Sequence, residues 1–300
     1  MTRPMDRIEG CGTALVTPFQ PDGALDTSAL ASLVEWQITE GINFLVPCGT
    51  TGESVTLTHH EYLEVIRITV ETARGRVPVV AGAGGNNTAK IIESIAELGK
   101  LGVDGLLSVS PYYNKPTQEG IFQHFRMIAQ STHLPVIVYN VPGRTSSNIL
   151  PETLLRLVEL PNILGVKEAS GDISQIGEIC TRAPREFKIF SGDDALTLPL
   201  IALGGHGIIS VASNEVPRMM SQFTRACLEG RWGEARAWNQ KLYPLMRANF
   251  IETSPIPVKA ALAMMGRISE SYRLPLVNIS QAARVKLSAV LSSLELIPHP

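Results

Sequence analysis

The residues of this chain best suited to chemistry lie at the ends of short apolar runs. Lys167 lies inside one such run, "ILGVKEA" at 163–169, where the neighbouring side chains indicate a buried strand. An ammonium group taken out of water loses several kcal/mol unless it is paired or neutralised. Burial therefore lowers the pKa of a lysine, and the free amine can attack a carbonyl carbon to form a Schiff base.

Suitable partners for such an amine follow other apolar runs. Tyr139 ends the preceding strand candidate, and its phenol could relay protons during imine formation. Thr50 and Thr51 offer hydroxyl and backbone N–H groups for a carboxylate, and Arg144 offers a planar fork for the same purpose. Taken singly, these residues have ordinary structural interpretations, such as a snorkelling lysine, turn threonines or a solvated arginine. Taken together, they predict an imine-forming site with carboxylate-binding groups.

The alternation of side chains along a strand indicates which residues share a face with Lys167. It places Ile163, Gly165 and Ala169 on the face of the lysine, so small residues flank the amine and leave room for a ligand. Glu168 is expected to point the other way. We therefore interpret it as an outward-facing polar group rather than a catalytic one.

Eight apolar runs, each followed by an amphipathic segment, must position these residues. The runs are 12–19, 43–50, 77–84, 105–111, 135–142, 163–169, 187–193 and 207–213. They are too apolar for a sheet with one wet face, and eight units in about 230 residues match the size of a (β/α)₈ TIM barrel, an α/β fold. A doubly wound sheet is the alternative, because alternation alone cannot show closure.

The alternation stops after Gly230, and the segments 231–250, 256–266 and 279–296 read as helices. We therefore predict a catalytic barrel over residues 1–230 and a C-terminal helical region, 231–300, packed on it. In a barrel, the loops after the strands form the active face, which would bring the polar residues described above together.

The overall composition excludes several classes of function. The 300 residues are 44% hydrophobic and 18% charged with a net charge of −2, which gives no electrostatic reason to expect nucleic acid or an anionic membrane as a partner. No run approaches the roughly 20 apolar residues of a membrane span, and the N-terminal stretch has no apolar signal core.

Four widely separated cysteines argue against a disulfide framework or a zinc site and fit a reducing cytoplasm. The chain also lacks a Walker loop, a complete dinucleotide fingerprint and an H-E-x-x-H motif, so metal and nicotinamide chemistry are disfavoured. The pair at 59–60, His-His, is expected at the exposed start of a helix.

A series of motifs resembles the dihydrodipicolinate synthase family over nearly the whole chain. In order, these are "GTTGES", "PYYNKP", "YNVPGRT", "GVKEASGD", "SGDD" and "GGHGIISV". The resemblance implies a (β/α)₈ barrel with C-terminal helices, assembled as a homotetramer of two tight dimers. It also implies condensation of pyruvate with L-aspartate 4-semialdehyde in the diaminopimelate route to lysine, with no cofactor or metal beyond the imine itself.

The resemblance assigns a role to each matching residue. Lys167 corresponds to the Schiff-base lysine and Tyr139 to the proton donor and acceptor. Thr50 and Tyr113 correspond to the partners of this tyrosine in a proton-relay triad, with Tyr113 reaching in from the neighbouring subunit. The positions that correspond to substrate-binding residues are Thr51 and Ile209 for pyruvate, and Arg144 and Gly192 for the semialdehyde.

Three other functions compete with this one. A sibling aldolase, such as an N-acetylneuraminate or keto-deoxy sugar acid lyase, would share the lysine, the threonine motif and the tyrosine. Arg144 and the paired tyrosines of "PYYN" favour the synthase. A non-catalytic binding protein should have lost a member of the triad, and a metal-dependent aldolase would need a ligand cluster that the sequence does not offer.

The resemblance also implies a regulatory site for lysine, which this chain matches incompletely. Ser54, His59, Asn86 and Tyr112 match the pattern of lysine-sensitive members. Lys90 replaces the glutamate that contacts the ammonium of the inhibitor, and Tyr62 replaces a histidine or glutamate. Like charges in one pocket repel, so we predict an enzyme insensitive or only weakly sensitive to lysine.

Overall fold

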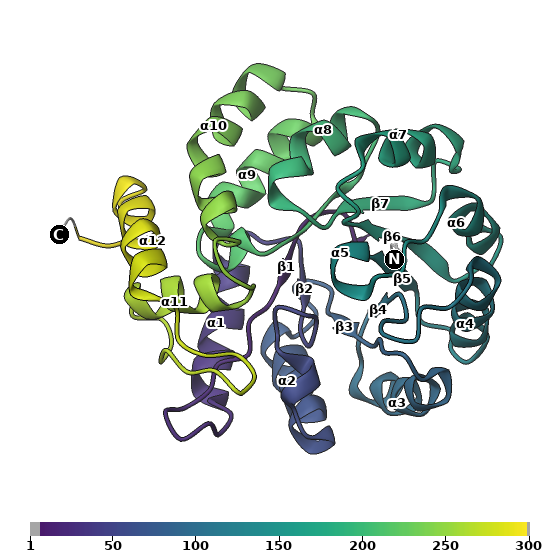
Figure 1. The fold of residues 1–300 in the computed structure, drawn as a ribbon, viewed down its shortest axis with the longest axis horizontal. Helices are drawn as coiled ribbons and strands as arrows, with labels where there is room; N and C mark the ends of the chain where they lie inside the picture. Colours follow the sequence, from purple (N-terminus) through teal and green to yellow (C-terminus); the bar gives the residue numbers. More distant parts are fainter. Residues whose placement is uncertain (1–6, 299–300) are drawn as a thin grey trace.

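The computed structural model describes residues 7–298, in which eight parallel strands form a barrel ringed by helices (Figure 1). The strands are β1 (Gly10–Ala14), β2 (Phe44–Val46), β3 (Val80–Gly82), β4 (Gly105–Val109), β5 (Val136–Asn140), β6 (Ile163–Glu168), β7 (Lys188–Ser191) and β8 (Gly207–Ser210). They pair in the order β2-β1-β8-β7-β6-β5-β4-β3, and a parallel bridge from Leu45 to Val79 joins β2 to β3. The predicted barrel is therefore confirmed, and the doubly wound alternative is wrong.

Helices follow each strand and continue beyond the last one. The α-helices around the barrel are α1 (Thr27–Thr39), α2 (His59–Ala73), α3 (Thr88–Leu101), α4 (Gln118–Gln130), α5 (Pro142–Thr145), α6 (Pro151–Val158), α7 (Ile173–Arg182), α8 (Thr197–Ala202) and α9 (Pro217–Leu228). Short 3₁₀ turns, η2 (Ser54–Thr56), η3 (Asp194–Leu196) and η4 (Ala212–Asn214), precede α2, α8 and α9. Helix α2 begins at His59 behind a reciprocal cap between Thr58 and Glu61, and both histidines are exposed there, as predicted.

The apolar core has two layers. The inner cluster draws buried residues from every strand, including Ala14, Phe44, Val80, Leu107, Ile137, Leu164, Phe190 and Ile209, and none from a helix. A larger cluster lies between the strands and the surrounding helices. The barrel interior is thus filled with side chains, so a ligand of the barrel is expected at its end and not along its axis.

Strand β6 departs from the predicted alternation. Leu164 belongs to the inner cluster while Ile163 and Val166 belong to the outer one, and Lys167 faces inward. The cause is a register irregularity, in which Val136 pairs with Ile163 and Ile137 pairs with Gly165, so that one residue of β6 is passed over. The prediction that Ile163 shares the face of Lys167 is therefore wrong, although the inward direction of the lysine holds.

Three further helices, α10 (Trp232–Ala248), α11 (Ile256–Met264) and α12 (Gln281–Ser293), lie beside α1 and α9 (Figure 1). Val258 and Leu262 of α11 form a small apolar cluster with Val16, Leu33 and Val211, which places α11 over the carboxyl ends of β1 and β8. Residues 1–6, which make up most of the N-terminal stretch predicted to lack a signal core, lie outside the described residues. Within 7–298, no helix is long and apolar enough to cross a membrane.

Candidate active site

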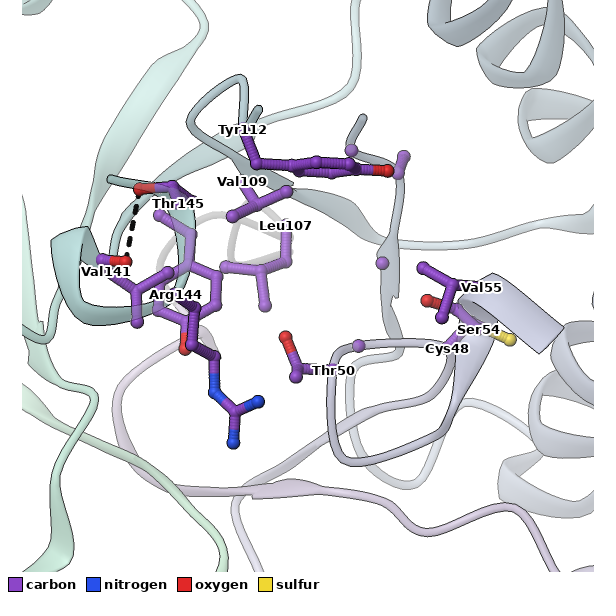
Figure 2. A pocket seen from close by; sticks show the side chains of 15 residues that line it. Cys48, Thr50, Ser54, Val55, Leu107, Val109, Tyr112, Val141, Arg144 and Thr145 are labelled. Atoms are coloured by element: carbon purple, nitrogen blue, oxygen red, sulfur yellow. Dashed lines mark hydrogen bonds between the residues drawn. The ribbon is translucent and has the colours of Figure 1, made fainter. Parts of the chain in front are cut away.

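A cavity at the carboxyl ends of the strands brings together most of the predicted site. Its lining includes Lys167, Tyr139, Thr50, Thr51, Arg144 and Gly192. Strands β5 and β6 pair Tyr139 directly with Lys167, which explains why two residues far apart in sequence lie side by side. A second cavity of about 250 Å³ shares Thr50, Tyr139 and Arg144 and opens toward Tyr112 (Figure 2). The cavity at Lys167 is small, about 30 Å³, and it shares Thr50, Tyr139 and Arg144 as a common wall with the larger one.

Lys167 has the properties of a nucleophilic amine. Its side chain is 5% exposed, and its Nζ atom lies 4.4 Å from the ring centroid of Tyr139. Burial lowers the pKa of Lys167 to about 8, while the Asp194 carboxylate opposes this effect and the Arg144 charge adds to it. At neutral pH, a lysine with that pKa holds a free-amine fraction roughly 300-fold larger than an ordinary lysine.

Tyr139 is buried beside the amine and remains a neutral phenol. Desolvation raises the pKa of Tyr139 to about 12, and both the Arg144 charge and a hydrogen bond with the Thr50 side chain oppose the rise. A neutral phenol both donates and accepts a hydrogen bond. Tyr139 can therefore pass a proton between a group bound at Lys167 and the hydroxyl of Thr50.

Arg144 approaches the cavity from the short helix α5. Its Nη2 donates to the backbone oxygen of Ser254 at 3.1 Å, and its side chain points into the space beside Thr50 (Figure 2). The remaining N–H groups of the guanidinium are suited to a carboxylate. Ser254 and Phe250, which line the Lys167 cavity from the segment before α11, were missed by sequence reasoning because no local pattern connects them to the barrel.

Gly192 leaves the space that the lysine occupies. A Cβ atom at position 192 would lie 3.1 Å from Cε of Lys167 and 2.7 Å from Cβ of Ala169. Any larger residue would therefore push against the lysine side chain. The Gly192 N–H donates to the backbone oxygen of Glu168 at 2.8 Å, which fixes the turn after β7 against β6.

Glu168 points away from the cavity, as predicted, but it is not a solvated group. It is 2% exposed and accepts hydrogen bonds from Asn140 Nδ2 at 3.0 Å and from the Ser170 N–H at 2.7 Å. Sequence reasoning took the outer face of the strand for a wet surface, whereas helices cover that face. Glu168 thus holds the ends of β5 and β6 together behind the site.

Asp194 is a buried carboxylate that sequence reasoning did not single out. It accepts from Ser210 Oγ at 2.5 Å and from the N–H groups of Val211 and Ala212 at 3.1 Å each. It is also the charge that opposes the effect of burial on the pKa of Lys167. The second aspartate of "SGDD" was the available signal, but its direction could not be read from the sequence.

Two of the predicted residues do not line the Lys167 cavity. Tyr113 is 88% exposed, has a left-handed φ of 73° and lines neither of these cavities. Ile209 is fully buried in the inner cluster with Tyr139, below the cavity. Neither position contradicts the expected role, since Tyr113 was expected to serve a neighbouring subunit.

The predicted regulatory residues surround a separate cavity of about 370 Å³. Its lining includes Ser54, His59, Tyr62, Asn86, Lys90 and Tyr112. Tyr62 donates its hydroxyl to the backbone oxygen of Gly82 at 2.8 Å, and the exposed His59 contacts Glu97 at 2.7 Å. Ser54 and Tyr112 also line the cavity shown in Figure 2, so the two spaces share a wall.

In the part of the chain that the structure describes, no group of three or more His, Cys, Asp or Glu side chains is placed to hold a metal ion. A closed (β/α)₈ barrel with a buried lysine of lowered pKa beside a tyrosine defines the class of imine-forming, aldolase-type barrels. Within this class, the chain belongs to the dihydrodipicolinate synthetase family, whose model matches residues 7–294.

Individual relatives agree with this assignment. The chain is 55% identical over 285 residues to a 4-hydroxy-tetrahydrodipicolinate synthase of Koribacter versatilis, covering 95% of each chain. It resembles the crystal structure of a dihydrodipicolinate synthase from Aquifex aeolicus with a TM-score of 0.95 and 43% identity, covering 97% of this chain and 100% of that one. A structure described as the first monomeric variant of a dihydrodipicolinate synthase matches with a TM-score of 0.96 and 43% identity, covering 98% of this chain and 99% of that one.

Proposed function

We propose that this protein is a 4-hydroxy-tetrahydrodipicolinate synthase, which condenses pyruvate with L-aspartate 4-semialdehyde in lysine and diaminopimelate biosynthesis. The observation that carries the proposal is the buried Lys167, with its lowered pKa, 4.4 Å from the ring of Tyr139 and in one cavity with Arg144. The name carried by relatives at about half identity supports the choice of this reaction over that of a sibling aldolase.

The reaction begins with capture of pyruvate. The free amine of Lys167 attacks the keto carbon, and the tetrahedral carbinolamine loses its hydroxyl group as water to leave an imine. Tyr139 supplies the proton for the departing hydroxyl and takes up a proton from the nitrogen in the same sequence. Thr51, which is buried beside the lysine, holds the carboxylate of pyruvate through its hydroxyl and backbone N–H groups.

Carbon–carbon bond formation follows from the imine. Loss of a methyl proton converts the imine to an enamine, whose carbon attacks the aldehyde of the second substrate, and the aldehyde oxygen takes up a proton to become a hydroxyl group. The amino group of that substrate then attacks the imine carbon and displaces Lys167, so that the ring closes and the lysine returns as a free amine. Arg144 binds the carboxylate of that substrate, and the turn at Gly192 lines the same cavity. The lysine nitrogen serves as the electron sink throughout, so the chemistry requires neither a metal nor an organic cofactor.

In this mechanism, the proton relay includes residues from two subunits. Thr50 links Tyr139 to the phenol of Tyr113 from a second copy of the chain, while Ile209 supports the base of the pyruvate pocket. The 88% exposure of Tyr113 supports this arrangement, because a large aromatic residue in a left-handed conformation is costly unless a contact holds it. We further propose a homotetramer built from two such dimers, located in the cytoplasm, with residues 1–230 as the catalytic barrel and 231–300 packed on it.

The cavity around Lys90 is proposed as a weakened regulatory site for lysine. Ser54, His59, Asn86 and Tyr112 supply the groups expected for binding, while Lys90 places a positive charge where the ammonium of the inhibitor would lie. Feedback inhibition is therefore expected to be weak or absent.

The proposed function is tested by a product assay. The purified protein is incubated with pyruvate and, separately, with L-aspartate semialdehyde, N-acetylmannosamine and a short sugar aldehyde, with and without a chelator. Heterocycle formation from the semialdehyde alone, unaffected by the chelator, is the expected result. Preferred turnover of either sugar substrate would instead assign the protein to the sibling aldolases.

A further inference from the structure

The loop that carries Thr50 and Thr51 is locally strained and needs support from elsewhere in the fold. It begins after Cys48 and ends at Glu53, and both of these residues have left-handed φ angles, 56° and 50°. Such a conformation is unfavourable for residues other than glycine and persists only where the surroundings impose it. Backbone hydrogen bonds from Gly52 to Gly49 and from Glu53 to Thr50, at 3.1 Å each, close the loop. The hydroxyl of Thr17, after β1, attaches it to the barrel by donating to the backbone oxygen of Gly52 at 2.7 Å.

The side chain of Glu53 provides a second attachment, to the C-terminal helices. Its Oε1 atom lies 2.5 Å from Nζ of Lys259 on α11, 206 residues later in the chain. The side chains are 1% and 0% exposed respectively, so the ion pair is fully removed from water. The ammonium also lies 4.3 Å from the ring centroid of Phe19 and 5.2 Å from that of Tyr272. A buried pair with aromatic walls holds one geometry far more strictly than a surface pair does.

The same C-terminal segment also contacts the other side of the cavity. Ser254, just before α11, accepts the hydrogen bond from Arg144, and it lines the Lys167 cavity together with Phe250. Helix α11 is in turn packed through Val258 over the ends of β1 and β8. The short segment from Ser254 to Lys259 therefore contacts both the threonine loop and the arginine.

We infer that Glu53 and Lys259 are positioning residues, whose buried ion pair holds Thr50 and Thr51 in place for pyruvate capture. This inference rests on the proposed function, since it assigns a role within that reaction. A small displacement of a binding group reduces the rate of a bound reaction steeply, and a shift of about 1 Å can cost on the order of 100-fold. The pair thus contributes to catalysis without touching a substrate.

The test uses the double variant Glu53→Gln/Lys259→Met in the full-length protein. Removal of both charges avoids leaving one of them buried without a partner, which would destabilise the fold by itself. The matched control is Glu9→Gln/Lys188→Met, which removes another Lys–Glu pair with a 2.5 Å separation at the opposite end of the barrel. Circular dichroism and the melting temperature establish that each variant is folded before kinetics are measured.

The expected result is that the constants for pyruvate change while the KM for the semialdehyde changes little. The double variant should show at least a tenfold higher KM for pyruvate and slower borohydride trapping of the imine on Lys167, with the KM for the semialdehyde within about twofold. The control variant should match the unmodified protein. A folded double variant with unchanged pyruvate KM and trapping rate would overturn the inference, because a merely structural pair would lower only the melting temperature.

Two further outcomes are decisive. If the double variant does not fold, Glu53→Gln alone is measured, because its amide oxygen still accepts a hydrogen bond from Lys259. A smaller rise in the KM for pyruvate, with the KM for the semialdehyde unchanged, supports the inference. Unchanged constants for both substrates overturn it. Failure of this variant to fold would also overturn it, since the pair would then serve the fold as a whole. An unmodified protein that traps pyruvate on Lys167 but makes no product from the semialdehyde would contradict the proposed function, while the trapping rates would still test the positioning role.

Discussion

Lys167 and Tyr139 are register partners on adjacent strands, with the lysine Nζ atom 4.4 Å from the centroid of the tyrosine ring. The pairing of the strands fixes this relationship, because neither side chain can move to a different neighbour without breaking the sheet. The amine is held beside a neutral phenol before any substrate arrives. Five predictions follow from this site and its surroundings.

Pyruvate followed by borohydride should inactivate the protein irreversibly and leave the adduct on Lys167. The reduced imine is a secondary amine, which cannot be hydrolysed. Peptide mass spectrometry locates the adduct, and attachment to any other lysine would refute the mechanism. Lys167→Arg should lose nearly all activity, since a guanidinium stays protonated in this pH range.

The buried Lys167 should cost the protein stability at neutral pH. The pKa of Lys167 is about 8 in the folded state, and its ordinary value is 10.5. Below pH 8 the folded state therefore holds a buried charge, which lowers the free energy of unfolding by on the order of 3 kcal/mol. The disadvantage disappears as the pH rises from 8 to above 10.5, because both states then lose the proton. Lys167→Met should therefore raise the melting temperature at pH 6–7 and raise it much less at pH 10. An equal gain at both pH values would show that the charge is not its cause.

Arg144→Ala should impair use of the semialdehyde far more than formation of the pyruvate imine. Loss of a partly buried, charge-assisted contact costs on the order of 2–4 kcal/mol, or roughly 30- to 800-fold in kcat/KM for that substrate. Steady-state kinetics with each substrate varied in turn, together with borohydride trapping, separate the two effects. Unchanged semialdehyde kinetics would favour a sibling aldolase.

The exposed Tyr113 should make a dimer the smallest active unit. Tyr113→Phe and Lys167→Arg should each be nearly inactive alone, yet mixing them under exchange conditions should restore about a quarter of the activity, because half of the random dimers contain one intact site. A mixture that recovers nothing, or a fully active monomer at high dilution, would contradict the shared site.

Inhibition by lysine should be weak, and Lys90→Glu should strengthen it. Two like charges 4 Å apart repel by around 4 kcal/mol at an effective dielectric near 20, and even half of that value weakens binding more than tenfold. Titration of both proteins with lysine into the millimolar range provides the measurement. Strong inhibition of the unmodified protein at micromolar lysine would show that Lys90 turns away from the ligand.

Local patterns predicted most of the fold and the centre of the site. The eight apolar runs coincide with the eight strands, and the motifs at their ends placed Lys167, Tyr139 and Arg144 in one cavity. Contacts between distant segments were beyond the sequence. Arg144 contacts Ser254, 110 residues later in the chain, through a backbone oxygen. Every residue has such an oxygen, so the residue type at position 254 gives no sign of this contact. Likewise, the burial of Glu168 depends on helices that cover β6, not on β6 itself.

At the passed-over residue in β6, the alternation of inward and outward side chains shifts by one position. Leu164 and Lys167 both face inward although they are three positions apart, an odd spacing that a regular strand cannot achieve. If the same residues followed a regular register, Leu164 and Lys167 would face opposite ways, and one of the two would point outward against the helices. A Cβ atom on Gly165, next to the irregularity, would lie 2.1 Å from the backbone oxygen of Lys188, so the irregular segment also depends on a glycine. A designer who transplants residues 163–168 into an idealised barrel must therefore copy the irregular register as well, so that Leu164 and Lys167 both face inward.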